Sequence, residues 1–140
     1  MLRTIEKVVY TAHTHTAGGR DGWAKSSDGA LDVKLSPPGS GKPGTNPEQL
    51  FAIGWSACFM GAMRRAGAPL GIRVPDDVAI DADVSLGTTA DQGFALAAKL
   101  TVSLPGLTHE QKQQLVEGAH QLCPYSHATR GNIDVSFEIL

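Results

Sequence analysis

The stretch TNPEQLFAIGWSACFMGAMRRAG, residues 45–67, carries the start and stop signals of one long helix. Asn46 can cap the first free amides, and Pro47 fits the first helical turn. Two arginines stand in the expected last turn, and Gly67 follows them as a C-terminal signal. About 20 residues of helix span roughly 30 Å, the width of a small domain. This helix therefore sets the scale of the fold.

Large apolar residues cover nearly the whole circumference of this helix, and only small residues separate them. The large ones are Leu50, Phe51, Ile53, Trp55, Phe59, Met60 and Met63. A helix with this pattern is either buried on every side or spans a membrane. Spanning a membrane needs a longer uncharged run than the flanking Glu48, Gln49 and arginine pair leave. We therefore expect a central core helix with one cysteine, Cys58, in its second half.

The remainder of the chain predicts a mixture of strands and one further helix. Period-two alternation or β-branched residues predict strands over residues 3–16, 23–25, 31–35, 78–86, 94–104 and 133–139. Thr108 and Gln111 predict a capping box for a helix from 108 to about 122, and Pro124 interrupts that helix. This order indicates one α+β domain, residues 1–140, built on hairpin-linked antiparallel sheets.

Composition excludes several classes of partner and location. A net charge of −2 and a pI near 6.2 give no electrostatic reason to expect nucleic acid or an anionic membrane. The N-terminal sequence MLRTIEKVVY has no apolar signal core. Two cysteines are too few for a secreted disulfide framework, and they indicate free thiols or one functional pair. We expect a cytoplasmic protein.

The apolar central helix also predicts the assembly. One small sheet covers only one side of a helix, so a helix that is apolar all round needs cover from elsewhere. Two chains whose sheets wrap a shared pair of such helices would supply it, in the two-fold arrangement usual for dimers. We therefore expect a homodimer.

The two cysteines are the main candidates for chemistry. Cys58 alone has an ordinary interpretation as a small buried core residue. Cys123 lies at a helix end before Pro124, where exposure and movement are expected. One thiol in a core and one on a mobile corner fit a nucleophile and its resolving partner, provided that their Cα atoms come within about 7 Å.

A nucleophilic thiol inside a helix needs a fixed positive charge to lower its pKa. Arg20, on the glycine-rich turn at residues 18–22, is the best candidate, and Glu48 is the carboxylate that could hold it. Alone, Arg20 is an ordinary turn residue and Glu48 an ordinary helix N-terminal carboxylate. Ten residues of straight helix separate Glu48 from Cys58 by about 15 Å. Either the helix bends near Gly54, or carboxylate and thiol come from different chains of the dimer; we favour the second arrangement.

Histidines offer a competing metal site. His13 and His15 share one face of a predicted strand, and His120 and His127 lie near Cys123 in the sequence. Zinc binds such Cys and His ligands, but the spacing matches no standard zinc motif. We expect no metal.

Four segments resemble the organic hydroperoxide resistance (Ohr) branch of the OsmC/Ohr superfamily. They are GGRDG at 18–22, TNPEQLFA at 45–52, SACF at 56–59 and CPYSHATRGNI at 123–133. The resemblance runs nearly end to end, and it implies an intertwined α+β homodimer with two active sites at the interface. Trp55-Ser56 departs from the family, which more often has Tyr-Ala there.

The resemblance implies a thiol-dependent peroxidase for organic (alkyl or fatty-acid) hydroperoxides. Cys58 resembles the peroxidatic cysteine and Cys123 the resolving cysteine. Arg20 resembles the arginine that stabilises the thiolate, and Glu48 the carboxylate that orients that arginine. It further implies a Cys58–Cys123 disulfide reduced by a dithiol, preferably a lipoyl group on a carrier protein, with no metal, haem or flavin. A thiol redox sensor or disulfide relay, and a non-catalytic ligand-binding dimer, are the alternatives.

Overall fold

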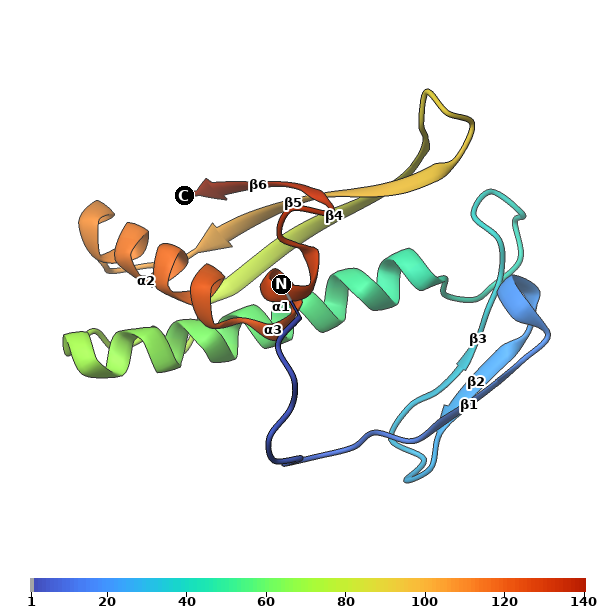
Figure 1. The fold of residues 1–140 in the computed structure, drawn as a ribbon, viewed down its shortest axis with the longest axis horizontal. Coiled ribbons are helices and arrows are strands. Elements are labelled where there is room, and N and C mark those ends of the chain that lie inside the picture. Colours follow the sequence, from blue (N-terminus) through green and yellow to red (C-terminus); the bar gives the residue numbers. More distant parts are fainter. Residues whose placement is uncertain (1) are drawn as a thin grey trace. The chain divides into compact units, whose positions relative to one another are not determined.

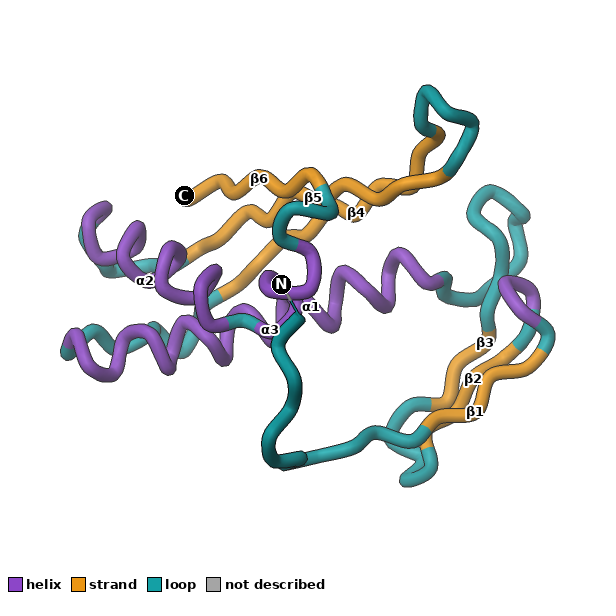
Figure 2. The backbone as a smooth tube through the Cα atoms, viewed as in Figure 1, coloured by secondary structure: helices purple, strands orange, loops and turns teal. Residues whose placement is uncertain are grey.

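The computed structural model describes residues 2–140, and the chain forms two compact units, Met1–Pro47 and Glu48–Leu140. The first unit contains β1 (Thr14–Ala17), η1 (Gly19–Asp21), β2 (Trp23–Ser26) and β3 (Asp32–Lys34). The second contains most of α1 (Pro47–Gly67), then η2 (Ala68–Leu70), β4 (Ala79–Thr88), β5 (Phe94–Ser103), α2 (His109–Leu122), α3 (Pro124–Thr129) and β6 (Asp134–Ile139) (Figures 1 and 2). The predicted α+β class is confirmed.

The first unit is a three-stranded antiparallel sheet in the order β1-β2-β3. Its hairpin turns at Asp28, whose carboxylate accepts hydrogen bonds from the Ser26 hydroxyl and the Ala30 amide. These two bonds lower the pKa of Asp28. Gly29 has φ = 75°, a left-handed conformation that favours glycine. The hairpin predicted here is confirmed.

The strand predicted over residues 3–16 is wrong for most of its length. Strand pairing begins only at Thr14, and residues 2–13 are exposed. The apolar side chains of Ile5, Val8, Val9 and Tyr10 all lie in solvent in the single chain. β-branched composition favours an extended chain, but a strand forms only where a neighbouring strand accepts its hydrogen bonds.

The second unit has the sheet order β4-β5-β6. β4 and β5 form a long antiparallel hairpin, in register from Ala79↔Ser103 to Thr88↔Phe94. β6, in contrast, pairs with β5 in parallel, which corrects the expectation of purely antiparallel sheets. The reason is the connection: α2 and α3 carry the chain back along the sheet, so β6 starts from the same end as β5.

The core lies between this sheet and the helices (Figure 1). Its largest fully buried side chains are Trp55, Phe59 and Met63 of α1, Leu100 of β5, Leu104 just after β5, and Leu115 of α2. α2 approaches α1 closely because Gly118 has no side chain: a Cβ there would lie 2.8 Å from the Ala66 Cβ. The predicted capping box of α2 is confirmed, with Thr108 and Gln111 exchanging hydrogen bonds of 3.0 and 3.2 Å.

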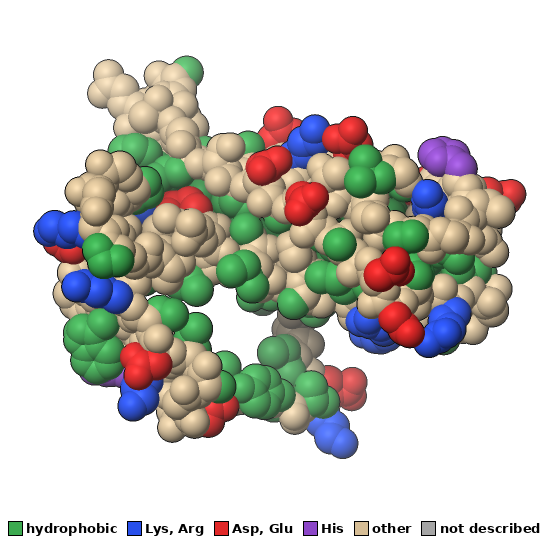
Figure 3. Space-filling view, turned by 180° about the vertical axis from the view of Figure 1, so that it is seen from behind, with side chains coloured by type: hydrophobic (Ala, Val, Ile, Leu, Met, Phe, Trp, Pro, Cys, Tyr) green, Lys and Arg blue, Asp and Glu red, His purple; other side chains and the backbone are tan. Residues whose placement is uncertain are grey.

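The opposite face of the sheet is polar. Asp81 and Asp83 alternate with inward apolar residues along β4, and Lys99 forms an ion pair of 2.9 Å with Glu138. On the face of the molecule drawn in Figure 3, acidic and basic side chains are interspersed, in keeping with the small net charge. A surface with such mixed charges does not create an extended electrostatic potential of one sign.

α1 is not buried all round in the single chain. Its buried side follows Trp55, Phe59, Met63 and Ala66, whereas Ala57 and Gly61 are exposed and Ile53 is 67% exposed. The sheet therefore covers one side only, as the sequence predicts for a single chain. Within residues 2–140 no helix is both long and apolar enough to cross a membrane.

His120 predicts a pH-dependent stability. Its ring packs edge-on against Phe137 at 4.9 Å, and its buried Nδ1 has no hydrogen-bond partner in the described chain. Burial, and then the charge of Arg130, lower the pKa of His120. The folded state therefore disfavours the charged form of His120, while the unfolded chain binds a proton below the ordinary pKa of about 6.5.

We expect His120 to make its full contribution to the free energy of unfolding above pH 6.5. This contribution should decrease as the pH drops from 6.5 toward the lower pKa of the folded state. Urea denaturation at pH 7 and pH 5 measures this loss. His120→Phe should lose less stability between the two pH values than the wild type does. Its control, His109→Gln, changes an exposed histidine of the same helix. Equal pH dependence in the wild type and His120→Phe would contradict the prediction.

Candidate active site

The fold of the second unit brings its two cysteines together. The Cys123 thiol donates a hydrogen bond to the Cys58 sulfur, with 3.4 Å between the two Sγ atoms. Both are free thiols, Cys58 half-buried on α1 and Cys123 buried between α2 and α3. A disulfide requires about 2.05 Å, so the sulfurs need to approach by only about 1.3 Å. The two sulfurs are therefore close enough for a disulfide to form with a small rearrangement.

Cys123 is placed by a break between two helices. It ends α2 and begins α3 in an extended conformation, with φ = −68° and ψ = 123°. Pro124 causes this, because a residue before proline is excluded from the helical region, while proline itself suits the first turn of a new helix. The break turns the short helix α3 across α1.

Three contacts dock α3 on α1 around the sulfur pair. The indole N–H of Trp55 donates to the hydroxyl of Ser126 at 3.3 Å, and both side chains are fully buried. The Tyr125 ring lies over Gly54, where a Cβ would come within 2.9 Å of the phenolic oxygen. Phe51 packs edge-on against the same ring, with 6.0 Å between centroids. Together with the sulfur contact, these interactions hold Cys123 against the helix that carries Cys58.

The surroundings of Cys58 favour the neutral thiol in this unit. Burial is the main cause that raises the pKa of Cys58, while the backbone N–H of Tyr125 lowers it by a smaller amount. A thiolate nucleophile at neutral pH therefore needs a positive charge brought to the sulfur.

The exposures expected for the two cysteines are reversed. The sequence predicts Cys123 on a mobile corner, and it is fully buried; the sequence predicts Cys58 in the core, and it is half-buried. Proline ends α2 as predicted, but the next residues at once form α3 and pack on α1. A helix of six residues has no periodicity strong enough to be recognised in the sequence.

Arg20 and Glu48 lie in different units. Arg20 is exposed in η1, after Gly18 and Gly19, both left-handed. The loop closes tightly, since a Cβ at Gly22 would lie 1.7 Å from the carbonyl oxygen of Ala17. Glu48 is half-buried in the first turn of α1. Their approach to Cys58 stays a prediction.

The sequence did not identify Trp55, Ser126 and Tyr125 as residues of the site. In the sequence, Trp55 stands out only as one member of an apolar helix and as a departure from the family. Its partner Ser126 lies 71 positions away, so no local pattern joins them. For the competing metal site, residues 2–140 contain no group of three or more His, Cys, Asp or Glu side chains that could hold an ion.

Comparisons with known proteins place the chain in a family. Residues 39–138 match the family described as OsmC-like protein. An organic hydroperoxide resistance protein of Xanthomonas axonopodis pv. citri is 51% identical, with 99% of each chain covered. The chain belongs to the OsmC/Ohr family.

Solved structures agree with this assignment. The crystal structure of the organic hydroperoxide resistance protein OhrB of Bacillus subtilis matches with a TM-score of 0.88 at 42% identity, over 95% of this chain and all of that one. An organic hydroperoxide resistance protein from Elizabethkingia anophelis matches with a TM-score of 0.84 at 40% identity, over 95% of this chain and 97% of that chain. The two-sheet α+β arrangement is thus the OsmC/Ohr fold.

The Trp55–Ser126 hydrogen bond predicts how firmly Cys123 is held. Ser126→Ala leaves the buried indole N–H unpaired, at a cost of about 1–3 kcal/mol in docking α3. We expect the Cys58–Cys123 disulfide to become easier to reduce, by about tenfold or more in the equilibrium with glutathione. Ser136→Ala, on the exposed face of β6, is the control. An unchanged equilibrium constant in Ser126→Ala would show that this bond does not position the thiol.

Proposed function

We propose that this protein is a cysteine-based organic hydroperoxide reductase, with residues 1–140 acting as one domain. The observation that carries the proposal is the Cys58–Cys123 pair, two reduced sulfurs 3.4 Å apart with only one of them reachable from solvent. The relatives named organic hydroperoxide resistance protein support the substrate class. A half-buried thiol beside a buried one suits a peroxidase of the two-cysteine type.

The proposed reaction has three steps. The Cys58 thiolate attacks the terminal oxygen of the hydroperoxide, the O–O bond breaks, and the alkoxide takes a proton and leaves as the alcohol. Cys58 is then a sulfenic acid. The Cys123 sulfur attacks the Cys58 sulfur, water leaves, and a disulfide forms. An external dithiol reduces this disulfide by thiol–disulfide exchange and is itself oxidised.

Burial supports these roles for the two cysteines. A hydroperoxide reaches the half-buried Cys58, whereas the fully buried Cys123 is shielded until Cys58 has been oxidised. The same argument makes Cys58 the sulfur on which an incoming dithiol acts. A small and flexible dithiol fits this approach, and we propose a lipoyl group on a carrier protein as the reductant.

Apolar side chains around the thiol support an organic substrate. Phe51 and Tyr125 form an aromatic wall on α1 and α3, with Trp55 packed edge-on against Phe51 at 5.7 Å. Such a wall contributes binding energy for an alkyl or fatty-acyl chain, which hydrogen peroxide lacks.

Arg20, held by Glu48, is the proposed source of the charge that keeps Cys58 ionised. In a homodimer with antiparallel α1 helices, the Glu48 end of one helix would lie beside the Cys58 half of the other. The open side of α1 fits such a partner: Ile53, Ala57 and Met60 line an apolar groove of about 240 Å³ with Ile80 and Ala82 of β4. We propose that a second copy of the chain covers this groove and that the active dimer is cytoplasmic.

Turnover of purified protein tests the activity. With tert-butyl hydroperoxide and a lipoyl dithiol, we expect steady consumption of peroxide, and much slower consumption of hydrogen peroxide. Cys58→Ser should lose turnover altogether, because no sulfur is left to attack the peroxide. Cys123→Ser should still be oxidised once at Cys58 and then stall as the sulfenic acid, which dimedone traps.

Two results would overturn the proposal. Turnover retained in Cys58→Ser would remove the cysteine mechanism. Disulfide formation without multiple turnovers would indicate a redox sensor or disulfide relay, and a folded protein whose Cys58 resists thiol reagents would indicate a non-catalytic binding dimer.

The pKa of Cys58 tests the role of Arg20 in the Cys123→Ser background, where one thiol titrates. The pH dependence of alkylation by iodoacetamide measures this pKa. We expect Arg20→Gln to raise it by about one unit or more, because one unit corresponds to 1.36 kcal/mol of lost charge stabilisation. Arg20→Lys should give an intermediate value, and Lys25→Gln, which removes an exposed cation of the same unit, should have no effect. The same pKa in Arg20→Gln and Lys25→Gln would contradict this role.

A further inference from the structure

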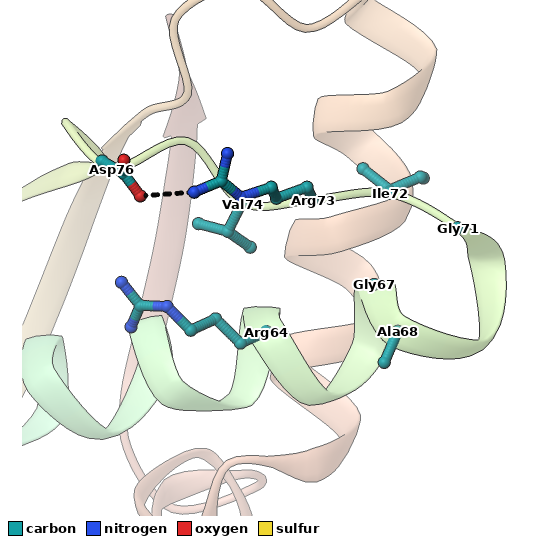
Figure 4. A pocket seen from close by; sticks show the side chains of 8 residues that line it. All are labelled: Arg64, Gly67, Ala68, Gly71, Ile72, Arg73, Val74 and Asp76. Atoms are coloured by element: carbon teal, nitrogen blue, oxygen red, sulfur yellow. Dashed lines mark hydrogen bonds and ion pairs between the residues drawn. The ribbon is translucent and has the colours of Figure 1, made fainter.

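A second pocket lies at the C-terminal end of α1, away from the thiol pair. It has a volume of about 430 Å³ and is lined by the end of α1, by η2 and by the segment that leads to β4 (Figure 4). Arg64, which lines it, follows Cys58 by six residues. On one helix this is about 9 Å along the axis and about 120° around it, so the pocket opens on another side of α1.

Two arginines reach along this pocket. Arg64 extends from α1 and Arg73 from the segment after η2, and the two side chains run the same way with the Val74 side chain between them (Figure 4). Arg73 forms an ion pair with Asp76 through one nitrogen and one oxygen at 3.0 Å. The Arg64 side chain has no ion pair or hydrogen bond to any residue in the range 2–140. The pocket thus carries two cations and one anion.

A tight turn holds the two arginines in this arrangement. The Ile72 amide donates to the carbonyl of Gly67 at 3.0 Å, and Gly71 is left-handed with φ = 67°. Gly67 allows the close return of the chain, since a Cβ there would lie 2.4 Å from the Ile72 carbonyl oxygen. Ile72 and Val74 are both buried and anchor the returning segment to the core. The backbone positions that carry the two guanidinium groups are therefore fixed before any ligand binds.

The unmet charge of the pocket determines what it can bind. Each guanidinium presents five N–H donors in a fork that matches a carboxylate, and here nearly all of them are unused within residues 2–140. The exposed Arg73–Asp76 pair is joined through one nitrogen and one oxygen, so the other donors of Arg73 stay available. Two guanidinium groups and one carboxylate leave an excess of one positive charge, which matches a monoanion.

We propose that the Arg64–Arg73 pocket binds a small organic acid with a single carboxylate. The carboxylate accepts hydrogen bonds from both guanidinium groups, and the aliphatic part lies along the arginine stems. This site is independent of the thiol chemistry, and none of its residues belongs to the proposed peroxidase centre.

Titration of the full-length protein with hexanoate, followed by amide chemical shifts, tests the site. We expect saturable shifts at residues 64–76 and an affinity about tenfold lower in Arg64→Gln and in Arg73→Gln, as for the loss of a charge-assisted hydrogen bond. Arg65→Gln removes the same charge from the same turn of α1 but does not line the pocket, and it should bind as the wild type does. Cys58→Ser should also bind normally.

Two comparison ligands separate charge from shape. Hexanamide has nearly the same shape without the charge, and inorganic phosphate has charge without an aliphatic chain; both should bind more weakly than hexanoate. Absence of saturable shifts, equal losses in Arg64→Gln and Arg65→Gln, or equal affinity for hexanamide or phosphate would each overturn the proposal. If Arg64→Gln instead weakened association between copies and left hexanoate binding unchanged, the arginines would serve a protein contact and the proposal would fail.

Discussion

The docking of α3 on α1 is the constraint on which the candidate active site depends. Cys58 and Cys123 are 65 residues apart in the chain, and neither α1 nor α2 alone would bring them together. Pro124 provides the break, Gly54 the room for Tyr125, and Trp55 a buried hydrogen bond that fixes Ser126. Because that hydrogen bond is fully buried, breaking it loses more free energy than breaking an exposed one would. Cys123 would then be held less firmly beside Cys58.

Burial acts on the site in two opposite directions. An apolar wall and a shielded second thiol suit an organic peroxide and a controlled disulfide, but the same burial raises the pKa of Cys58. A buried thiol therefore gains selectivity and loses reactivity unless a cation compensates. This is the physical reason to assign Arg20 a role in the chemistry, since the second unit shifts the Cys58 pKa in the wrong direction for a nucleophile.

Local signals in the sequence predicted the elements, and long-range contacts account for the errors. The extent of α1, the Asp28-Gly29 hairpin and the Thr108/Gln111 capping box depend on neighbouring residues, and all three are found where the sequence puts them. Gly67, however, is the last residue of α1 in a right-handed conformation, and the left-handed glycine is Gly71. The parallel pairing of β6, the burial of Cys123 and the unpaired N-terminal segment depend on what lies beside them in space. The pairing of the thiols was a hypothesis from cysteine count and family resemblance, because a sulfur–sulfur distance has no local signal.

α1 has so few polar residues because it serves several surfaces at once. One side packs into the core, the side of Cys58 receives α3, and the side of Ile53 and Ala57 stays open in the single chain. Close approach on two of these sides needs small residues: Gly54 beneath Tyr125, and Ala66 against Gly118. An ordinary amphipathic helix puts polar residues wherever its one buried stripe ends. The exposed residues Ile53, Ala57 and Gly61 on the open side of α1 carry no polar side chain, and this supports the proposal that a second chain covers that side.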